Sequence, residues 1–249
     1  MSSNDNNPPL CGWHSRGYLP HFDSPIHTQH VTVHLADSLP KSAIERIDQM
    51  IEALPDQERA VERRRRLHEW IDAGHGSCIL RQPESARIVE GAFHHFDGER
   101  YRLFAWVVMP NHFHVLFQPI GDCSMAEIVA SWKRYTATEI KKWLRARQES
   151  GDPGNAALPR GIVPDLTGAR QESGDPGNAA LPRGSISASK HVSRFLSGDF
   201  PIWPREYWDR YIRNKKHFND VIAYIHENPV KAKLCQSPEQ WCFSSACKL

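Results

Sequence analysis

The stretch YRLFAWVVMPNHFHVLFQPI, residues 101–120, contains two apolar and aromatic runs on either side of Pro110 and Asn111. Runs of this composition are typical of β-strands, and a Pro-Asn pair between them indicates a turn. We therefore predict a β-hairpin that turns at this pair. Side chains alternate between the faces of a strand, so His112 and His114 would point to the same side, about 7 Å apart along the chain.

The second strand of this hairpin carries apolar side chains on one face and histidines on the other. Phe113, Val115 and Phe117 would face a core, opposite to the two histidines. Two imidazoles that project together from a rigid strand are suited to binding a divalent metal. Two hydrogen-bonded histidines on a half-exposed strand would leave the same pattern, so the spacing alone fits both interpretations.

Other elements are expected on both sides of the hairpin. Alternation of β-branched residues predicts a strand at 30–35, and the segment 201–214 reads as extended or mixed. Apolar residues at helical spacing predict helices at 37–54, 58–72, 83–96, 124–147 and 215–234. Pro229 is expected to end or bend the last of these helices. This order of elements predicts an α+β fold with helices packed on an antiparallel sheet.

Composition sets broad limits on the class of protein. The chain has 249 residues, of which 40% are hydrophobic and 24% charged, so a sizeable core can form. The net charge of +2 is only mildly basic and does not by itself indicate a nucleic-acid partner. The six cysteines include no C-x-x-C pair, which argues against a zinc site built from cysteines. With no signal segment and no long apolar run, we expect a cytoplasmic protein with reduced thiols and no membrane partner.

A duplication interrupts the pattern of predicted elements. The 16 residues ARQESGDPGNAALPRG occur at 146–161 and again, unchanged, at 169–184. Two copies rich in Gly and Pro are too few and too polar to build a solenoid core. We predict a low-complexity insertion at 146–199 that forms an exposed loop. We expect a single domain over residues 1–249 that contains this insertion and begins with an irregular arm at 1–28.

A second pair of candidate residues lies in the segment YIHENPVKAKL. Tyr224 and Asn228 are four residues apart, so on a helix they share one face. A phenol and a carboxamide placed there can serve one centre. A packed tyrosine and an asparagine near a helix end would give the same letters, so this pair alone carries little weight.

Basic residues interleaved with aromatic ones form a third feature. Lysine and arginine bind phosphates, and aromatic rings stack on unpaired bases. The segment WPREYWDRYIRN at 203–214 has this composition, although core aromatics with surface charges would look the same. The run Arg63–Arg66 is interpreted as a solvated helix face rather than a specific contact.

Taken in order, three segments resemble one family. MPNHFHVLF, WPREYWDRYIRN and YIHENPVKAKL are similar to motifs of the REP-associated tyrosine transposases, a group of HUH single-strand transposases in which U is an apolar residue. RGYLPHFD and LADSLP, near the N-terminus, resemble one branch of that group. The resemblance covers most of the chain outside 146–199. It implies an HUH endonuclease fold, in which the sheet and helices form a ferredoxin- or RRM-like sandwich.

The resemblance also implies an active site. His112, His114 and Asn228 would bind Mg²⁺ or Mn²⁺, and Tyr224 would attack the scissile phosphate to give a 5′-phosphotyrosine. The implied substrates are single-stranded DNA hairpins formed by palindromic repeats. The residues expected to contact DNA are Arg16, Tyr18, Lys133, Arg134, Arg205, Arg210, Arg213, Lys215 and Lys216.

Several alternatives remain open at this stage. Tyr135 competes with Tyr224 as the nucleophile, and Glu227 or His226 competes with Asn228 as a ligand. The same fold would also suit a catalytically silent DNA- or RNA-binding regulator. An HUH replication initiator or relaxase is disfavoured, because the chain has no room for a helicase region. We expect a monomer, although a dimer that exchanges the nucleophile helix is the alternative.

Overall fold

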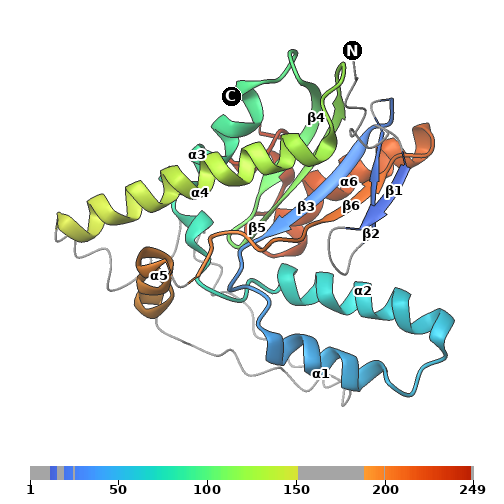
Figure 1. Ribbon diagram of the computed structural model, residues 1–249, viewed down its shortest axis with the longest axis horizontal. Helices are drawn as coiled ribbons and strands as arrows, with labels where there is room; N and C mark the ends of the chain where they lie inside the picture. Colours follow the sequence, from blue (N-terminus) through green and yellow to red (C-terminus); the bar gives the residue numbers. More distant parts are fainter. Residues whose placement is uncertain (1–11, 16–19, 25, 151–187, 199, 248–249) are drawn as a thin grey trace, which may run out of the picture.

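A computed structural model describes residues 12–15, 20–24, 26–150, 188–198 and 200–247 (Figure 1). The predicted hairpin is confirmed: β4 (Tyr101–Val108) and β5 (His112–Pro119) pair in antiparallel orientation. Its turn is closed by a hydrogen bond from the backbone N–H of Met109 to the carbonyl of His112, at 2.8 Å.

Two further strands complete the main sheet. β3 (Gln29–His34) pairs with β5 on one side and with β6 (Trp208–Tyr211) on the other, both antiparallel, which gives the order β4-β5-β3-β6. Along the chain, helices separate β3 from β4 and β5 from β6, whereas β4 and β5 form a hairpin. This arrangement, with β3 and β5 in the middle of the sheet, is that of the β-α-β-β-α-β motif. The α+β prediction is therefore confirmed.

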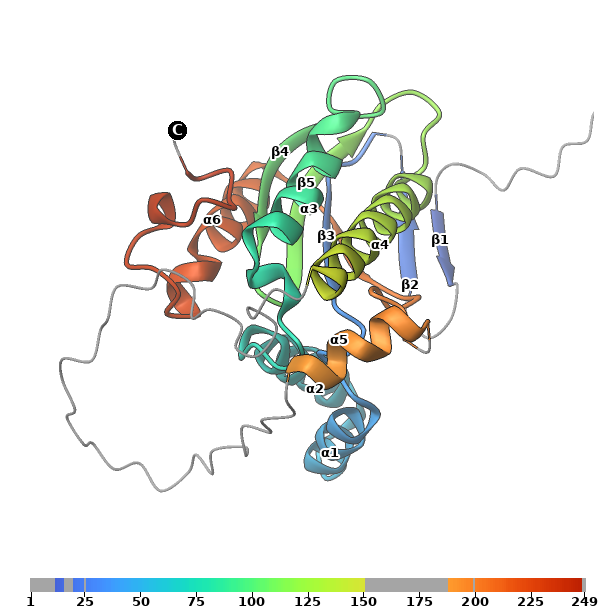
Figure 2. The same cartoon turned by 90° about the vertical axis from the view of Figure 1, so that its left-hand side faces the viewer.

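Helices lie on both faces of this sheet, as Figure 2 shows. The helices are α1 (Lys41–Ile51), α2 (Asp56–Asp72), α3 (Pro83–His95), α4 (Met125–Glu149), α5 (Ala188–Ser197) and α6 (Lys215–Lys231). α3 and α4 cover one face, where Phe113, Val115 and Phe117 are buried with Trp132 of α4. α6 covers the opposite face, where it packs on Val107 and other apolar side chains of β4 and β5.

Local sequence explains where these helices begin. Ser124 and Glu127 form a reciprocal capping box at the start of α4, and the Asn214 side chain accepts the N–H of His217 at the start of α6. Pro229, which is expected to end or bend this helix, does not end it, because α6 continues to Lys231, and a bend there stays a prediction. Pro229 lies in the last turn, and the Ala232 N–H still reaches the carbonyl of Asn228 at 3.0 Å.

The N-terminal arm is more regular than predicted. β1 (Gly12–Ser15) and β2 (Pro20–Asp23) form a two-stranded antiparallel hairpin, so an irregular arm is wrong for these residues. His21 anchors it, because its buried ring lies between Asp209 and Glu206. Burial opposes protonation of His21, but the hydrogen bonds and charges of these carboxylates outweigh it and raise the His21 pKa.

The bounds of the predicted insertion also change. α4 continues to Glu149, and α5 begins at Ala188, so both ends of 146–199 are helical. The duplicated segments fall largely within 151–187, outside the described residues. That a single domain spans 1–249 stays a prediction.

Candidate active site

His112 and His114 lie side by side on the sheet face that α6 covers. Both side chains are completely buried, and their Nε2 atoms are 3.1 Å apart. The expectation that they share one face is therefore confirmed. Because β5 is buried on both faces, these imidazoles are enclosed by protein and need partners of their own.

Asn111 determines which nitrogen of His112 carries the proton. Its Nδ2 donates to the carbonyls of Ile71 and His75, at 2.9 and 3.1 Å. Its Oδ1 is consequently the atom that faces His112 Nδ1, at 2.8 Å, and it has to accept a hydrogen bond there. The Nε2 atom of His112 is left with a lone pair that points at His114.

Thr32 of β3 positions the second histidine. Its Oγ1 lies 2.8 Å from His114 Nδ1 and can accept that proton, which would leave a second lone pair on His114 Nε2. Two such lone pairs facing each other are favourable only around a cation. Burial, followed by neighbouring histidines, lowers the pKa of His112 to about 3 and that of His114 well below its usual value. Both rings therefore stay neutral, the form that binds metals.

Asp72, the last residue of α2, adds a carboxylate that the sequence did not single out. Its Oδ1 lies 3.6 Å from His112 Nε2, and the ligand atoms of Asp72, His112 and His114 all lie within 4.8 Å of one another. Burial raises the pKa of Asp72 to about 6, despite the opposing charge of Lys231. A carboxylate and two imidazoles at these distances form a group that could hold a metal ion.

α6 brings Tyr224 and Asn228 to the same place, as their spacing predicts. Asn228 Nδ2 lies 3.2 Å from His114 Nε2, and the Tyr224 ring centroid lies 5.2 Å from that of His114. Burial, followed by the negative charge of Asp72, raises the pKa of the Tyr224 phenol. The hydroxyl therefore needs a compensating positive charge before it can act as a nucleophile.

Two orphaned oxygens indicate that a cation fits here. Neither Asn228 Oδ1 nor Asp72 Oδ1, both buried, has a hydrogen-bond partner. Exchanging the oxygen and nitrogen of the Asn228 amide by a half-turn would direct its oxygen at the histidines. Two imidazole nitrogens and two oxygens would then converge, a mixed donor set that could hold a divalent metal ion.

The competing residues lie elsewhere. The His226 ring is hydrogen-bonded to Ser245 Oγ at 2.9 Å, and Glu227 is not among the clustered ligands of the described residues. Tyr135 is 53% exposed on α4, the helix that covers the apolar face of the sheet, so the sheet separates it from the two histidines. Of the two tyrosines, only Tyr224 stands beside them.

The residues predicted to bind DNA fall into two groups. Lys133 donates to the carbonyl of Arg205 at 2.8 Å where α4 meets the segment before β6, and Arg134 is exposed on the same helix. The second group, at the end of β6 and the start of α6, comprises Arg210, Arg213, Lys215 and Lys216. Arg16 and Tyr18 lie outside the described residues.

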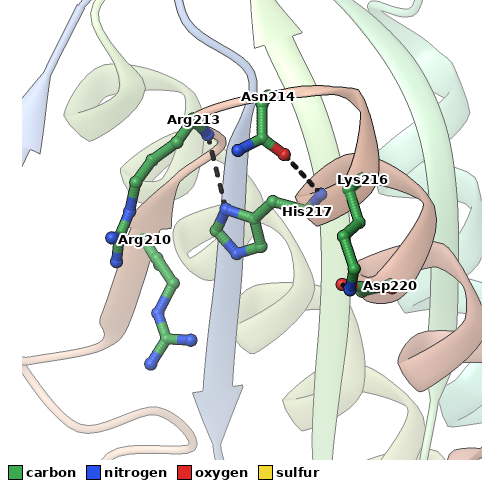
Figure 3. Close-up of a pocket in the computed structure, with 6 residues that line it drawn as sticks. All are labelled: Arg210, Arg213, Asn214, Lys216, His217 and Asp220. Atoms are coloured by element: carbon green, nitrogen blue, oxygen red, sulfur yellow. Dashed lines mark hydrogen bonds and ion pairs between the residues drawn. The ribbon is translucent and has the colours of Figure 1, made fainter.

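A cavity of about 360 Å³ marks the second group (Figure 3). Its lining residues are Arg210, Arg213, Asn214, Lys216, His217 and Asp220. Lys216 is paired with Asp220 at 2.7 Å. Burial lowers the pKa of His217, and the positive charges of Arg210 and Arg213 lower it further. The cavity is therefore positively charged and open to an anion.

Sequence reasoning missed Asp72, Thr32 and a further, partly buried histidine, His30. The His30 ring lies tilted against that of His114, with 5.4 Å between centroids, and its buried Nε2 has no hydrogen-bond partner. Alternation along β3 puts His30 and Thr32 on one side of the strand, which is the one signal that was available. Asn111 was interpreted only as a turn residue, although it also joins the end of α2 to the histidine strand.

Known proteins offer a similar solved structure but no matching family. No protein-family description matches the chain, and neither does any curated protein. Among solved structures, the chain is similar to a REP-associated tyrosine transposase bound to a REP hairpin, at 17% identity and a TM-score of 0.43, over 88% of this chain and 76% of that one. No helix of the described residues is both long and apolar enough to cross a bilayer. The roles of individual residues therefore rest on the geometry above.

Proposed function

We propose that this chain is a metal-dependent endonuclease and strand transferase that acts on single-stranded DNA hairpins of palindromic repeats. One observation carries the proposal: a phenol, an amide and two imidazoles from segments more than a hundred residues apart in the sequence meet in one buried cluster. Tyr224 stands beside the histidines of its own chain, which supports a site that is complete in a monomer.

His112, His114, Asp72 and Asn228 would hold the metal ion. A bound Mg²⁺ or Mn²⁺ would polarise the phosphodiester and offset the negative charge that develops on its oxygens. The remaining steps belong to the side chains of this chain. Asn111 and Thr32 keep the Nε2 atoms directed inward, and α6 holds the Tyr224 phenol next to them.

The reaction would be a transesterification. The Tyr224 oxygen forms a bond to phosphorus while the bond to the 3′ oxygen breaks, so the phenol loses a proton and the departing 3′-hydroxyl gains one. The product is a 5′-phosphotyrosine that conserves the energy of the phosphodiester. A 3′-hydroxyl can later attack this ester and rejoin the strand without another energy source.

Removal of the phenol oxygen tests this proposal. We expect Tyr224→Phe to abolish the covalent adduct with a labelled hairpin oligonucleotide in Mn²⁺, as followed on denaturing gels, while metal binding persists. Tyr135→Phe is the matched control and should form the adduct at the wild-type rate. An adduct that survives in Tyr224→Phe and disappears in Tyr135→Phe would reverse the assignment. Tight binding of the hairpin by the wild type without any adduct would instead indicate a regulator of the same fold.

A further inference from the structure

The arginine run of α2 contains one residue whose charge is unmatched. The ion pairs join Arg63 to Asp48, Arg65 to Glu62 and Glu69, and Arg66 to Glu62. Arg64 has no carboxylate within ion-pair distance in the part of the chain that the structure describes. Ion pairs therefore engage three members of the predicted solvated helix face, whereas Arg64 is exposed without a carboxylate partner among the described residues.

The side of α2 that carries Arg64 faces the active site. Arg64, His68 and Asp72 follow one another at intervals of four, so they lie along one side of the helix. Asp72 belongs to the metal-ligand cluster, and the His68 ring lies 5.4 Å from the ring of Trp208 in β6. Arg64 lies one helical turn before His68 on this side of α2. Arg210 follows Trp208 by two residues and therefore lies on the same face of β6.

Arg210 is a second cation without a carboxylate partner among the described residues. It is exposed in the cavity of Figure 3, where the acidic residue Asp220 is already paired with Lys216. Surrounding protein atoms, followed by the positive charges of Arg64 and Arg213, lower the pKa of Arg210. Arg64 of α2 and Arg210 of β6 therefore lie close enough for their charges to repel, and neither is paired with a carboxylate among the described residues.

Arg210 lies one strand away from a residue that contacts the proposed nucleophile. It pairs with His30 of β3, whose ring centroid lies 6.0 Å from that of Tyr224. The charge of Arg210 reaches Tyr224, where it opposes the rise of the phenol pKa caused by burial and Asp72. His217, which lines the same cavity, lies seven residues before Tyr224, two turns earlier on the same side of α6. An anion bound by Arg210 would therefore lie on the face of the sheet that carries the Tyr224 ring.

We propose that Arg64 and Arg210 together bind one backbone phosphate of the DNA strand, next to the phosphate that Tyr224 attacks, and thereby determine which phosphodiester is cleaved. The inference rests on the proposed function, which supplies the strand. Guanidinium groups match phosphate oxygens with paired hydrogen bonds, and a phosphate between them replaces mutual repulsion with two attractions. Arg64 thus acts as a residue that positions the substrate.

Arg64→Gln and Arg65→Gln form a matched pair of variants for the binding test. Both remove one positive charge from neighbouring exposed positions of α2, but Arg65 is engaged by Glu62 and Glu69. The probe is a fluorescent DNA hairpin with single-stranded flanks, titrated at several NaCl concentrations in EDTA. Loss of one phosphate contact should make the slope of log K against log [NaCl] less negative by about 0.7 in Arg64→Gln and in Arg210→Gln. Arg65→Gln should keep the wild-type slope.

Neutral phosphate analogues locate the contact. With methylphosphonate placed at each position in turn, one position near the cleavage site should weaken binding by the wild type and have no further effect on Arg64→Gln. In Mn²⁺, the adducts of Arg64→Gln should spread over neighbouring phosphates, whereas those of Arg65→Gln stay at one position. Equal slopes in Arg64→Gln and Arg65→Gln, or no position whose effect depends on Arg64, would overturn the inference.

The two proposals fail in different ways. Binding of the hairpin in EDTA requires no cleavage. If the salt dependence of binding changes in Arg64→Gln but the wild type forms no adduct, the phosphate contact is supported and the strand-transfer function is contradicted. An adduct that forms at one position in all variants supports the function and contradicts the contact. No binding of the hairpin by the wild type would reject both.

Discussion

The two faces of strand β5 are equally buried, but one packs against apolar side chains and the other against polar ones. On one face, Phe113, Val115 and Phe117 are buried among the apolar side chains of α3 and α4. On the other face, His112 and His114 are equally buried, but against polar groups from α2, β3 and α6. Burial of apolar surface stabilises a fold, whereas burial of polar groups costs free energy unless partners satisfy them. One strand therefore divides its residues between the apolar core and a candidate metal site.

The apolar face should give the largest effect on stability. Phe113 is 1% exposed and contacts the rings of Phe93 and Trp203, so Phe113→Ala would leave a cavity in the centre of the core. We expect it to lower the free energy of unfolding by about 3–5 kcal/mol, as measured by urea denaturation in EDTA. If His114→Gln in the same buffer were equally destabilising, the histidine face would be structural and the contrast between the two faces would disappear.

The histidine face should respond to metal instead. Mn²⁺ at a hundredfold excess over its Kd should stabilise the wild type by about 2.7 kcal/mol, seen as a rise in Tm. His112→Gln and His114→Gln should lose this response, because each removes one of the two facing nitrogens. Asp72→Asn should weaken it, and Tyr224→Phe should retain it. A full metal response in His114→Gln would show that the ion binds somewhere else.

The smallest effect, when counted for one histidine and one unit of pH, is a loss of stability in acid in the absence of metal. The folded-state pKa of His112 and of His114 is lowered mainly by burial, so below about pH 6.5 the unfolded chain binds protons that the folded chain does not. Stability should therefore fall as the pH decreases from about 6.5 towards 4, by on the order of 1 kcal/mol per pH unit for each histidine. Asp72, with its pKa raised to about 6, acts in the opposite direction and partly offsets this slope.

Urea titrations of the wild type and His114→Gln at pH 6.5, 5.5 and 4.5 would measure this effect. The variant should have a shallower dependence on pH, because one of the two depressed groups is missing. Phe113→Ala is the control, and it should keep the wild-type slope at a lower overall stability. A wild-type slope in His114→Gln would mean that this imidazole does not resist protonation in the folded protein.

Local pattern explains what could be predicted about the fold. The hairpin at Pro110-Asn111, the strand at β3 and the positions of five helices follow from periodicity and turn residues, which act over a few neighbouring positions. The β1-β2 hairpin could not be predicted in this way. Its short strands are held by His21 against Asp209, a contact between residues 188 positions apart in the sequence. Pro229 removes one backbone donor but does not stop α6, which continues for two more residues to Lys231.

By itself, the sequence determined which residues share a face: His112 with His114 on a strand, and Tyr224 with Asn228 on a helix. These relations depend only on the periods of two residues per strand repeat and 3.6 per helical turn. Only the tertiary structure decided that the two faces meet, that Tyr135 lies across the sheet, and that Asp72 and Arg64 of α2 reach the same region. The physical reason is that such contacts depend on how whole helices dock on the sheet, through groups such as Asn111 that join distant segments.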